Sequence, residues 1–510
     1  MESKNLPTIR ELLDLAPARF PDRVFIRYLH DGEVVDRTYA EVRSDALAVC
    51  RRLRRTLPAN AHVAIMSRST YAYIVWLTGL LIGGFVAIPL APELSPADAG
   101  AILRDADAAV LLHEPEIGAK ADELRALCPS LTEAIEISDE GLDAIRAEYG
   151  DGSPYAALSD VAVDPEACQL IIYTSGTTGE KKGVMLSGRA LVANVNVEAF
   201  DDVANRSDVL LSALPLYHIF CFVSDYIFPL QNGNMICLNG DMRYLFKNLL
   251  RFRPQQMRVV PTLAAALLAR INGVRQRHPE WTPEQAAANV TGGNLKIMFS
   301  GGAYLDPALC RGFEEYGIFL RQGYGMSEAG CKITVPDRQT ALDSVGRLMN
   351  ICEARTAPDG ELQILTPCRM LGYYKRPDLT AEAFTEDGWL RTGDLGYVTE
   401  DRQVFITGRA KNLIILANGE NVSPEGIERR YLADPLVSEV LVYAENGAIT
   451  AEIYPNPDAR CDDPEAALWK LTDDMNRTAA PSHTVAKLKV RTSPFEKTAT
   501  GKLIRPKQTL

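Results

Sequence analysis

The sequence predicts an α/β protein with a large N-terminal domain of several lobes and a small α+β C-terminal domain. Short apolar runs such as HVAIMS (62–67) and FVAIPL (85–90) alternate with helical patterns such as residues 39–56. This alternation is typical of a parallel sheet covered by helices. The length of 510 residues also suggests about three domains or lobes.

The composition is that of an ordinary globular protein, with 47% hydrophobic and 24% charged residues. The net charge of −12 argues against general nucleic-acid binding. Ten cysteines are scattered without a CxxC pair or a Cys/His cluster of zinc spacing, which predicts reduced thiols in a cytoplasmic protein. The N-terminal segment MESKNLPTIRELL lacks an apolar h-region, so we expect no secretory signal.

The segment 71–92, YAYIVWLTGLLIGGFVAIPLAP, carries no charge and is long enough to cross a membrane. Gly83 and Gly84 interrupt it, and the apolar run that follows is short and β-like. No asymmetry of Lys and Arg flanks it. We therefore expect a buried helix, a glycine turn and a buried strand rather than a membrane span.

The pattern changes after residue 350. GELQILTP (360–367) and LRTGDLGYV (390–398) are short strand patterns separated by Gly, Asp and Pro, which indicates a small β-rich lobe. The strand and hairpin patterns after Arg409 indicate a small α+β unit, so we expect domains at 1–408 and 409–510. The second domain holds 14 basic and 14 acidic residues, so the net charge of −12 lies wholly in the first.

A loop rich in Gly, Ser, Thr and Lys follows the apolar run at 170–172. Residues 173–184 read YTSGTTGEKKGV and hold four Ser and Thr hydroxyls, three glycines and two lysines. Glycines let backbone N–H groups approach an anion, hydroxyls add donors, and Lys adds charge. The spacing is not that of a Walker A loop. A flexible linker rarely carries paired lysines between two apolar runs, so we predict a phosphate-binding loop.

This loop and the motifs that follow it in order closely resemble the adenylate-forming superfamily, which includes acyl-CoA synthetases, firefly luciferase and the adenylation domains of peptide synthetases. The other matching segments are LPLYHIF (214–220), SGGAYLDP (300–307), QGYGMSEAG (322–330), GYYKRP (372–377), GWLRTGDLGYV (388–398), GRAKNLIILANGENVSPEGIE (408–428) and EKTATGKLIR (496–505). The resemblance covers nearly the whole chain. It implies parallel α/β sheets plus a small distorted β-barrel in the large domain, and a mobile C-terminal domain.

The resemblance also implies that the chain activates a carboxylic acid with ATP, giving an acyl-adenylate and pyrophosphate. Such a reaction needs positioning and charge neutralisation more than covalent help. Lys181 stands where the family commonly has Pro, and it adds charge beside the loop. The residues that would hold the β- and γ-phosphates are Ser175, Gly176, Thr177, Thr178, Gly179 and Lys182.

The family pattern assigns the magnesium and adenine contacts to neighbouring residues. Glu328 would bind Mg²⁺ together with Thr177, because this hard cation favours carboxylate, hydroxyl and phosphate oxygens. Tyr324 would stack on the adenine, with Gly325 beside it. Ser327 stands where Thr is usual and keeps the hydroxyl.

The last motifs would complete the nucleotide site. Asp394 would accept hydrogen bonds from the ribose, with Arg409 as a second ribose or phosphate contact and Ile406 near the sugar or base. Lys502 would neutralise the charge that develops between the carboxylate and the α-phosphate. Lys411 would be the hinge about which the small domain rotates between adenylation and thioester formation.

The acid's own chain would lie between two motif segments. His218 would flank the acyl group, although a buried core histidine is the alternative. Residues 219–223 are apolar or small, and Gly301, Gly302 and Ala303 would line the far side. No charge is evident there to pair with an α-amino group, which disfavours amino-acid substrates and favours an apolar chain or an aryl ring.

We therefore predict a cytoplasmic acid–thiol ligase that uses ATP, Mg²⁺ and CoA to convert a fatty or aromatic acid into its thioester. A stand-alone adenylation enzyme that loads the phosphopantetheine of a carrier protein would use the same motifs and is the alternative. A non-catalytic nucleotide-binding regulator is a third hypothesis, which the intact set of motif residues argues against. We expect no nucleic-acid partner.

Overall fold

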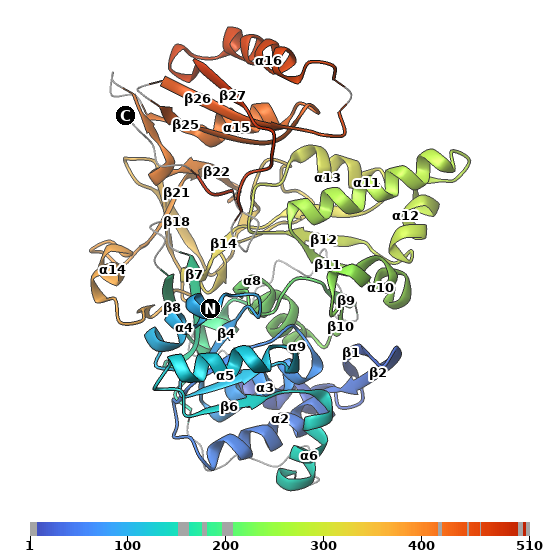
Figure 1. Ribbon diagram of the computed structural model, residues 1–510, viewed down its shortest axis with the longest axis vertical. Coiled ribbons are helices and arrows are strands. Elements are labelled where there is room, and N and C mark those ends of the chain that lie inside the picture. The colour runs from blue at the N-terminus through green and yellow to red at the C-terminus, as the bar shows by residue number, and fades with distance from the viewer. Residues whose placement is uncertain are drawn as a thin grey trace. The chain divides into compact units, whose positions relative to one another are not determined.

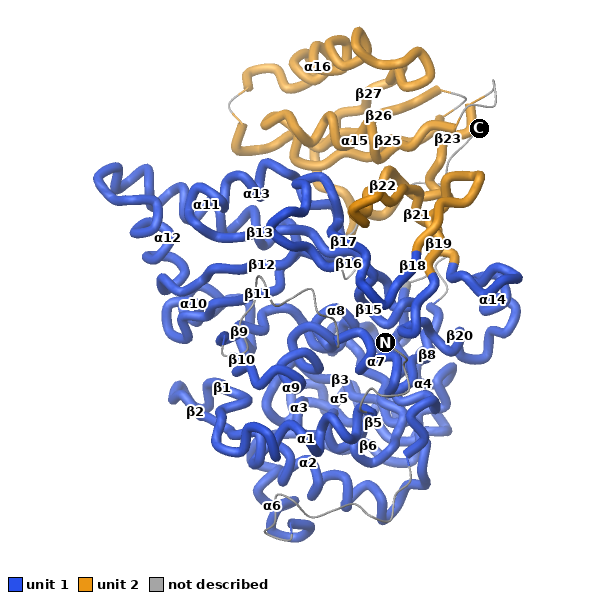
Figure 2. The backbone as a smooth tube through the Cα atoms, turned by 180° about the vertical axis from the view of Figure 1, so that it is seen from behind, with its two compact units in different colours: residues 1–353, 365–390 blue, residues 354–364, 391–510 orange. Residues whose placement is uncertain are grey.

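The structure, a computed structural model, describes residues 8–150, 163–175, 181–195, 208–416, 421–445, 448–459, 461–497 and 503–505. The chain divides into two compact units, shown in different colours in Figure 2. Unit 1 comprises residues 1–353 and 365–390, and unit 2 comprises residues 354–364 and 391–510. The predicted boundary at residues 408–411 therefore lies inside unit 2.

The first sheet of unit 1 has seven strands in the order β20-β8-β7-β4-β3-β5-β6. The pairs among β7, β4, β3, β5 and β6 are parallel, while β8 and β20 join antiparallel. The strands are β3 (His62–Met66), β4 (Val86–Leu90), β5 (Val110–His113), β6 (Glu133–Glu136), β7 (Cys168–Ser175), β8 (Lys181–Ser187) and β20 (Gly372–Tyr373). The helices that precede, connect or follow them are α1 (Ile9–Arg19), α2 (Tyr39–Arg54), α3 (Tyr71–Gly83), α4 (Pro96–Asp105), α5 (Gly118–Leu127), α6 (Asp139–Tyr149), α7 (Gly188–Ala193) and α14 (Pro377–Glu382).

The second sheet of unit 1 also has seven strands, in the order β13-β12-β11-β9-β10-β1-β2, and only the β1–β2 pair is antiparallel. The strands are β1 (Val24–His30), β2 (Glu33–Thr38), β9 (Val209–Ser212), β10 (Met235–Leu238), β11 (Gln256–Val259), β12 (Ile297–Ser300) and β13 (Phe319–Gln322). Its helices are α8 (Ile219–Cys221), a π-helical turn (Phe222–Ile227), α9 (Phe228–Asn232), α10 (Leu245–Phe252), α11 (Pro261–Arg277), α12 (Pro283–Thr291) and α13 (Pro307–Glu314). In Figure 1, α10 to α13 gather beside β11 and β12, where they share one apolar core with the sheet.

The uncharged segment 71–92 folds as predicted. Thr70 caps α3 by accepting from the backbone of Tyr73, and every residue of α3 is buried. Gly84 ends the helix in the left-handed conformation at φ 70°, which glycine adopts without steric cost. Strand β4 follows, fully buried. In the part of the chain that the structure describes, no helix is long and apolar enough to span a membrane.

Among its described residues, unit 2 is built from short sheets, two α-helices and short 3₁₀ turns. A four-stranded sheet contains β18 (Glu353–Thr356), β19 (Glu361–Leu365), β21 (Leu390–Val398) and β22 (Val404–Arg409). The remaining elements are β23 (Ile414–Ile415), β24 (Asn421–Val422), α15 (Pro424–Leu432), β25 (Val437–Glu445), β26 (Ala448–Pro455), α16 (Pro464–Thr478) and β27 (Lys487–Val490). The elements after β22 surround an apolar core of their own. The predicted fold class, parallel α/β sheets with a separate small α+β domain, is confirmed. All ten cysteines are free thiols.

Candidate active site

The predicted phosphate-binding loop joins β7 to β8, two strands whose register pairs Ser175 with Lys181 and Thr174 with Lys182. Both lysines therefore stand at the start of an ordered strand directly after the loop. Four predicted phosphate-binding residues lie outside the described residues: Gly176, Thr177, Thr178 and Gly179.

The two lysines have different partners. Nζ of Lys181 lies 2.9 Å from Oδ1 of Asp98, in the first turn of α4. The hydrogen bond from Lys181 lowers the pKa of the Asp98 carboxyl. Lys182 instead places its ammonium 5.2 Å from the ring centroid of Tyr373, which is cation–π distance. The additional positive charge of Lys181 is thus paired with the carboxylate of Asp98, whereas Lys182 contacts the ring of Tyr373.

Tyr373 connects Lys182 to the predicted magnesium ligand. It lies in β20, whose register with β8 pairs it with Val184. Its hydroxyl donates a 2.8 Å hydrogen bond to Oε1 of Glu328. Burial, with the Glu328 carboxylate, raises the pKa of the Tyr373 phenol, so the hydroxyl keeps its proton at neutral pH. Three residues from three separate motifs therefore form one contact chain: Lys182, Tyr373 and Glu328.

Glu328 belongs to a tight turn between two short strands, β14 (Gly325–Met326) and β15 (Cys331–Lys332). A side chain at Gly325 would lie 1.7 Å from the carbonyl oxygen of Cys331, so only glycine permits this pairing. The backbone N–H of Tyr324 donates to Oγ1 of Thr334 at 2.9 Å. Ser327 and Glu328 are both half-buried in a 3₁₀ turn (Ser327–Ala329).

The predicted acyl-binding segments come together in unit 1. His218 precedes α8 and is half-buried, and burial lowers the pKa of its imidazole, which favours the neutral form. A Cβ on Gly301 would approach the ring of Phe220 to 3.2 Å, so these two segments lie in contact. Gly302, at φ 81°, and Ala303 are exposed beside Gly301.

Sequence reasoning missed three buried charges close to these segments. Asp225 lies in the π-helical turn after α8, Arg258 in β11 and Lys332 in β15. Their exposed fractions are 0%, 1% and 7%. No charge was evident there from the sequence to pair with an α-amino group, and these three side chains were not foreseen. The available signal was one charged residue within each of the apolar runs CFVSDYIF (221–228) and QMRVV (256–260).

In unit 2, the predicted ribose-binding residues form an ion pair. Strands β21 and β22 pair Asp394 with Arg409, and Nε of Arg409 lies 2.8 Å from Oδ1 of Asp394. The carboxylate is buried, while the guanidinium is exposed. Thr392 supports the turn by accepting from the backbone N–H of Asp394 at 3.1 Å. Ile406, paired with Gly396 in the same hairpin, is half-buried.

The two remaining predicted residues of unit 2 differ in what the structure describes. Lys411 is exposed, in a single 3₁₀ turn (Ala410–Asn412) that directly follows β22. Lys502 lies outside the described residues. The described neighbours of Lys502 pair by an isolated bridge between Lys497 and Leu503.

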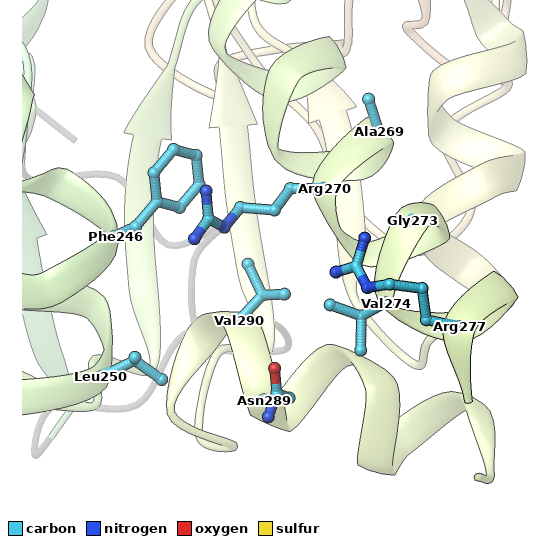
Figure 3. A pocket seen from close by; sticks show the side chains of 9 residues that line it. All are labelled: Phe246, Leu250, Ala269, Arg270, Gly273, Val274, Arg277, Asn289 and Val290. Carbon is cyan, nitrogen blue, oxygen red and sulfur yellow. The ribbon is translucent and has the colours of Figure 1, made fainter.

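A cavity of about 320 Å³ in unit 1 lies apart from the predicted site residues, none of which lines it. Figure 3 shows the two guanidinium groups and the side chain of Phe246 around it. Arg270 stacks over Phe246, with its Cζ 4.3 Å from the ring centroid. The lining residues come from α10, α11 and α12: Phe246, Leu250, Ala269, Arg270, Gly273, Val274, Arg277, Asn289 and Val290.

Comparisons with known proteins show which family and fold the chain is similar to. Residues 13–374 match the AMP-binding enzyme family, and residues 411–509 match the AMP-binding enzyme C-terminal domain. A sulfoacetate–CoA ligase of Cupriavidus necator is 31% identical over 487 residues, covering 91% of each chain. A long-chain-fatty-acid–CoA ligase of Mycobacterium bovis is 28% identical, covering 83% of this chain and 78% of that protein. The crystal structure of an anthranilate CoA ligase with anthranoyl-AMP has a TM-score of 0.83 at 20% identity, covering 99% of this chain and 97% of that one.

Proposed function

The chain belongs to the AMP-binding enzyme family, and from this premise we propose that it is an ATP-dependent CoA ligase. In the proposed reaction, a carboxylate oxygen of the acid attacks the α-phosphorus of ATP. The bond to the β-phosphate breaks, and pyrophosphate leaves. The thiol of CoA then attacks the acyl carbonyl, loses its proton and displaces AMP. The relatives act on different acids by name, so this proposal specifies the reaction and not the acid.

The contact chain from Lys182 through Tyr373 to Glu328 carries the proposal. In this contact chain, the ammonium of Lys182 contacts the ring of Tyr373 and the carboxylate of Glu328 accepts from its hydroxyl. Lys182 lies in β8, directly after the Gly-rich loop. Lys182 would bind phosphate oxygens as a point charge. Glu328 fits Mg²⁺, because that ion is held by one or two carboxylates plus substrate phosphates. When bound, Mg²⁺ would supply positive charge to those phosphates. Tyr373 would hold the carboxylate in one orientation.

Unit 2 would supply the remaining nucleotide contacts and the alternation between half-reactions. Asp394 would accept from the ribose hydroxyls, and Arg409, already paired with it, would bind the ribose or a phosphate. Lys502 would stabilise the negative charge that builds up on the α-phosphate during attack. Lys411 would absorb the backbone rotation that exchanges the adenylation and thioester-forming arrangements.

The direct test is pyrophosphate release from ATP and Mg²⁺, screened over a panel of carboxylic acids that spans aliphatic, aromatic and doubly anionic members. Release that depends on one acid, followed by a CoA thioester identified by mass, supports the proposal. If no acid causes pyrophosphate release, the proposal is contradicted, and a non-catalytic nucleotide-binding regulator becomes the better explanation.

The acceptor requires its own measurement, because CoA and a carrier protein present the same phosphopantetheine thiol. The acid that gives pyrophosphate release should be offered with CoA and, in a separate assay, with carrier proteins that bear a free phosphopantetheine thiol. We expect the thioester to form on CoA. Thioester on a carrier protein with none on CoA would contradict this part of the proposal.

A further inference from the structure

The two strands that flank the Gly-rich loop are both attached to one helix, α4. Nζ of Lys181, the first residue of β8, lies 2.9 Å from Oδ1 of Asp98, in the first turn of α4. On the other side of the loop, the hydroxyl of Tyr173, in β7, donates to Oδ2 of Asp105 at 2.7 Å. Asp105 is the last residue of α4. We call Asp98 and Asp105 the loop anchors.

Helix α4 is a firm support because capping and packing fix its position. Ser95 caps the helix by accepting from the backbone N–H of Asp98, and the Ser95 hydroxyl donates to Oδ2 of Asp98 at 2.7 Å. On its buried face, α4 shares an apolar core with β7 through Ala99, Leu103 and Ile171. Figure 1 shows α4 beside β7 and β8. Close packing of this kind resists shifts of the helix, so both anchors keep fixed positions next to the loop.

Asp105 also connects β7 to the segment that carries Tyr373. Its Oδ1 lies 3.2 Å from Nη2 of Arg376, three residues after Tyr373. Its backbone carbonyl oxygen accepts from Nζ of Lys375 at 2.9 Å, which places a cation at the C-terminus of α4, where the helix dipole favours it. One residue therefore joins the strand before the loop to the segment whose tyrosine belongs to the proposed contact chain.

The two loop anchors differ in burial. The side chain of Asp105 is 23% exposed, and that of Asp98 is 52% exposed. Electrostatic contacts are stronger where water is partly excluded, so Asp105 is expected to be the stronger anchor. Burial, followed by the hydrogen bond to Asp105, raises the pKa of the Tyr173 phenol. The hydroxyl therefore keeps its proton at neutral pH and remains a donor.

We propose that Asp98 and Asp105 are positioning residues for the binding of the terminal phosphates of ATP. They would hold the two ends of the Gly-rich loop, and Asp105 would keep the β7 end at a fixed position relative to Tyr373. Glycine has more backbone freedom to lose than other residues, so ordering such a loop around an anion is entropically costly. Fixing both ends beforehand reduces that cost. The inference rests on the proposed function, since it concerns the same ATP site.

The test compares two nucleotides that differ in the groups that the loop would bind. A non-hydrolysable ATP analogue carries β- and γ-phosphates, and AMP lacks both. Calorimetric titration of each, with Mg²⁺ present, gives the ratio of their affinities, in which losses at the adenine and ribose contacts cancel. Asp105→Asn should lower the ratio of analogue to AMP affinity by about tenfold, as expected when a hydrogen bond to a charged group is lost. A ratio equal to that of the parent overturns the inference.

The sign of the effect separates positioning from plain electrostatics. Removal of an acid near the loop should strengthen phosphate binding if charge is all that matters. If Asp98 instead positions the loop by holding Lys181, Asp98→Asn should lower the ratio, by about threefold because an exposed ion pair is weak. A ratio that rises in Asp98→Asn and in Asp105→Asn would overturn the inference.

A double variant tests whether Asp105 acts through the loop strand. Tyr173→Phe removes the hydroxyl and keeps the ring, and it should lower the ratio by about fivefold. Asp105→Asn combined with Tyr173→Phe should lose no more than Asp105→Asn alone, because both changes remove the same hydrogen bond. Losses that add in full would show that the two residues act independently, contrary to the inference.

Asp45→Asn is the matched control. Asp45, in α2, also shares its carboxylate between a tyrosine and an arginine, Tyr71 of α3 and Arg146 of α6. Its replacement should leave the ratio unchanged even where it lowers the thermal midpoint. A fall as large as that in Asp105→Asn would trace the effect to lost stability and overturn the positioning role.

Pyrophosphate release separates this inference from the proposed function. A lowered ratio in Asp98→Asn and Asp105→Asn, in a protein that releases no pyrophosphate with any acid, would support the loop anchors and contradict the ligase assignment. Pyrophosphate release by the parent, with an unchanged ratio in both variants, would overturn the loop anchors alone.

Discussion

The hydroxyl of Tyr373 donates a 2.8 Å hydrogen bond to Oε1 of Glu328, while the ammonium of Lys182 lies 5.2 Å from the centroid of the same ring. One phenol thus contacts both a proposed phosphate ligand and the proposed Mg²⁺ ligand. The ring and the hydroxyl can be separated by mutation, because phenylalanine keeps the first and removes the second.

Tyr373→Phe should lower kcat/KM for pyrophosphate release by about tenfold, because a hydrogen bond to a charged group contributes roughly 1.5–3 kcal/mol. It should also raise the Mg²⁺ concentration needed for half-maximal rate. Tyr374→Phe is the control: its hydroxyl donates to Asp107 at 2.9 Å instead. Equal losses in the two variants would contradict a positioning role for Tyr373.

Asp394→Asn should weaken ATP binding by about tenfold, since a carboxylate that accepts from the ribose becomes a neutral amide. The measurement is calorimetric titration with a non-hydrolysable ATP analogue. Asp401→Asn serves as the control, because Asp401 lies in the exposed turn between β21 and β22, where it accepts from Gln403 at 2.7 Å. Unchanged affinity in Asp394→Asn would exclude the proposed ribose contact.

Lys502→Ala should reduce adenylation by roughly 100-fold or more, in line with the loss of one preorganised charge-stabilising group. Thioester formation from a supplied acyl-adenylate and CoA should continue near the parent rate. Lys487→Ala, in β27, controls for loss of positive charge in the same part of the chain. Adenylation at the parent rate in Lys502→Ala would show that another group performs this role.

Lys411→Pro should impair thioester formation more than adenylation, because proline fixes φ near −65° and restricts the rotation proposed at this position. The two half-reactions are measured separately, by pyrophosphate release and by transfer from a supplied acyl-adenylate. Lys411→Ala, which removes the charge but leaves the backbone free, should be close to the parent in both. Equal losses in both steps for Lys411→Pro would argue against the hinge.

The buried ammonium of Lys332 predicts a pH-dependent stability. Burial lowers its pKa from 10.5 to about 8, so between these values the unfolded chain binds the proton more readily. The free energy of unfolding therefore rises as pH increases from about 8 toward 10.5. Below pH 8, the full destabilisation caused by burying the charged ammonium is present. Lys332→Met should raise the thermal midpoint by roughly 5 °C at pH 8, and the gain should shrink as pH approaches 10.

Thermal unfolding at the two pH values checks this expectation. Lys247→Met, at an exposed position in α10, is the control and should show no pH-dependent difference from the parent. A gain for Lys332→Met that is the same at both pH values would mean that better packing, and not the removed charge, is the cause.

Secondary structure could be predicted from the sequence where residues close together in the chain determine it. Gly83 and Gly84 divide segment 71–92 into α3 and β4. The left-handed conformation that ends α3 at Gly84 is one that glycine adopts without steric cost, so this break follows from the residue itself. The β7–loop–β8 hairpin follows in the same way from apolar runs on both sides of a Gly-rich stretch. The family motifs singled out both Asp394 and Arg409, but their pairing in one hairpin and their ion pair are seen only in the structure.

The sequence by itself determined the fold class and the order of the motifs, because each depends on short stretches of chain, and it supplied the candidate site residues as predictions. The tertiary structure alone decided which distant side chains meet. Tyr373 donates a hydrogen bond to Glu328, which is 45 residues away in the sequence. Asp225, in the π-helical turn, forms an ion pair with Arg258, in β11. Apolar periodicity cannot distinguish a charge at a surface from one buried in a core. The cost of burial, and hence the need for a partner, arises only once the chain has folded around the group.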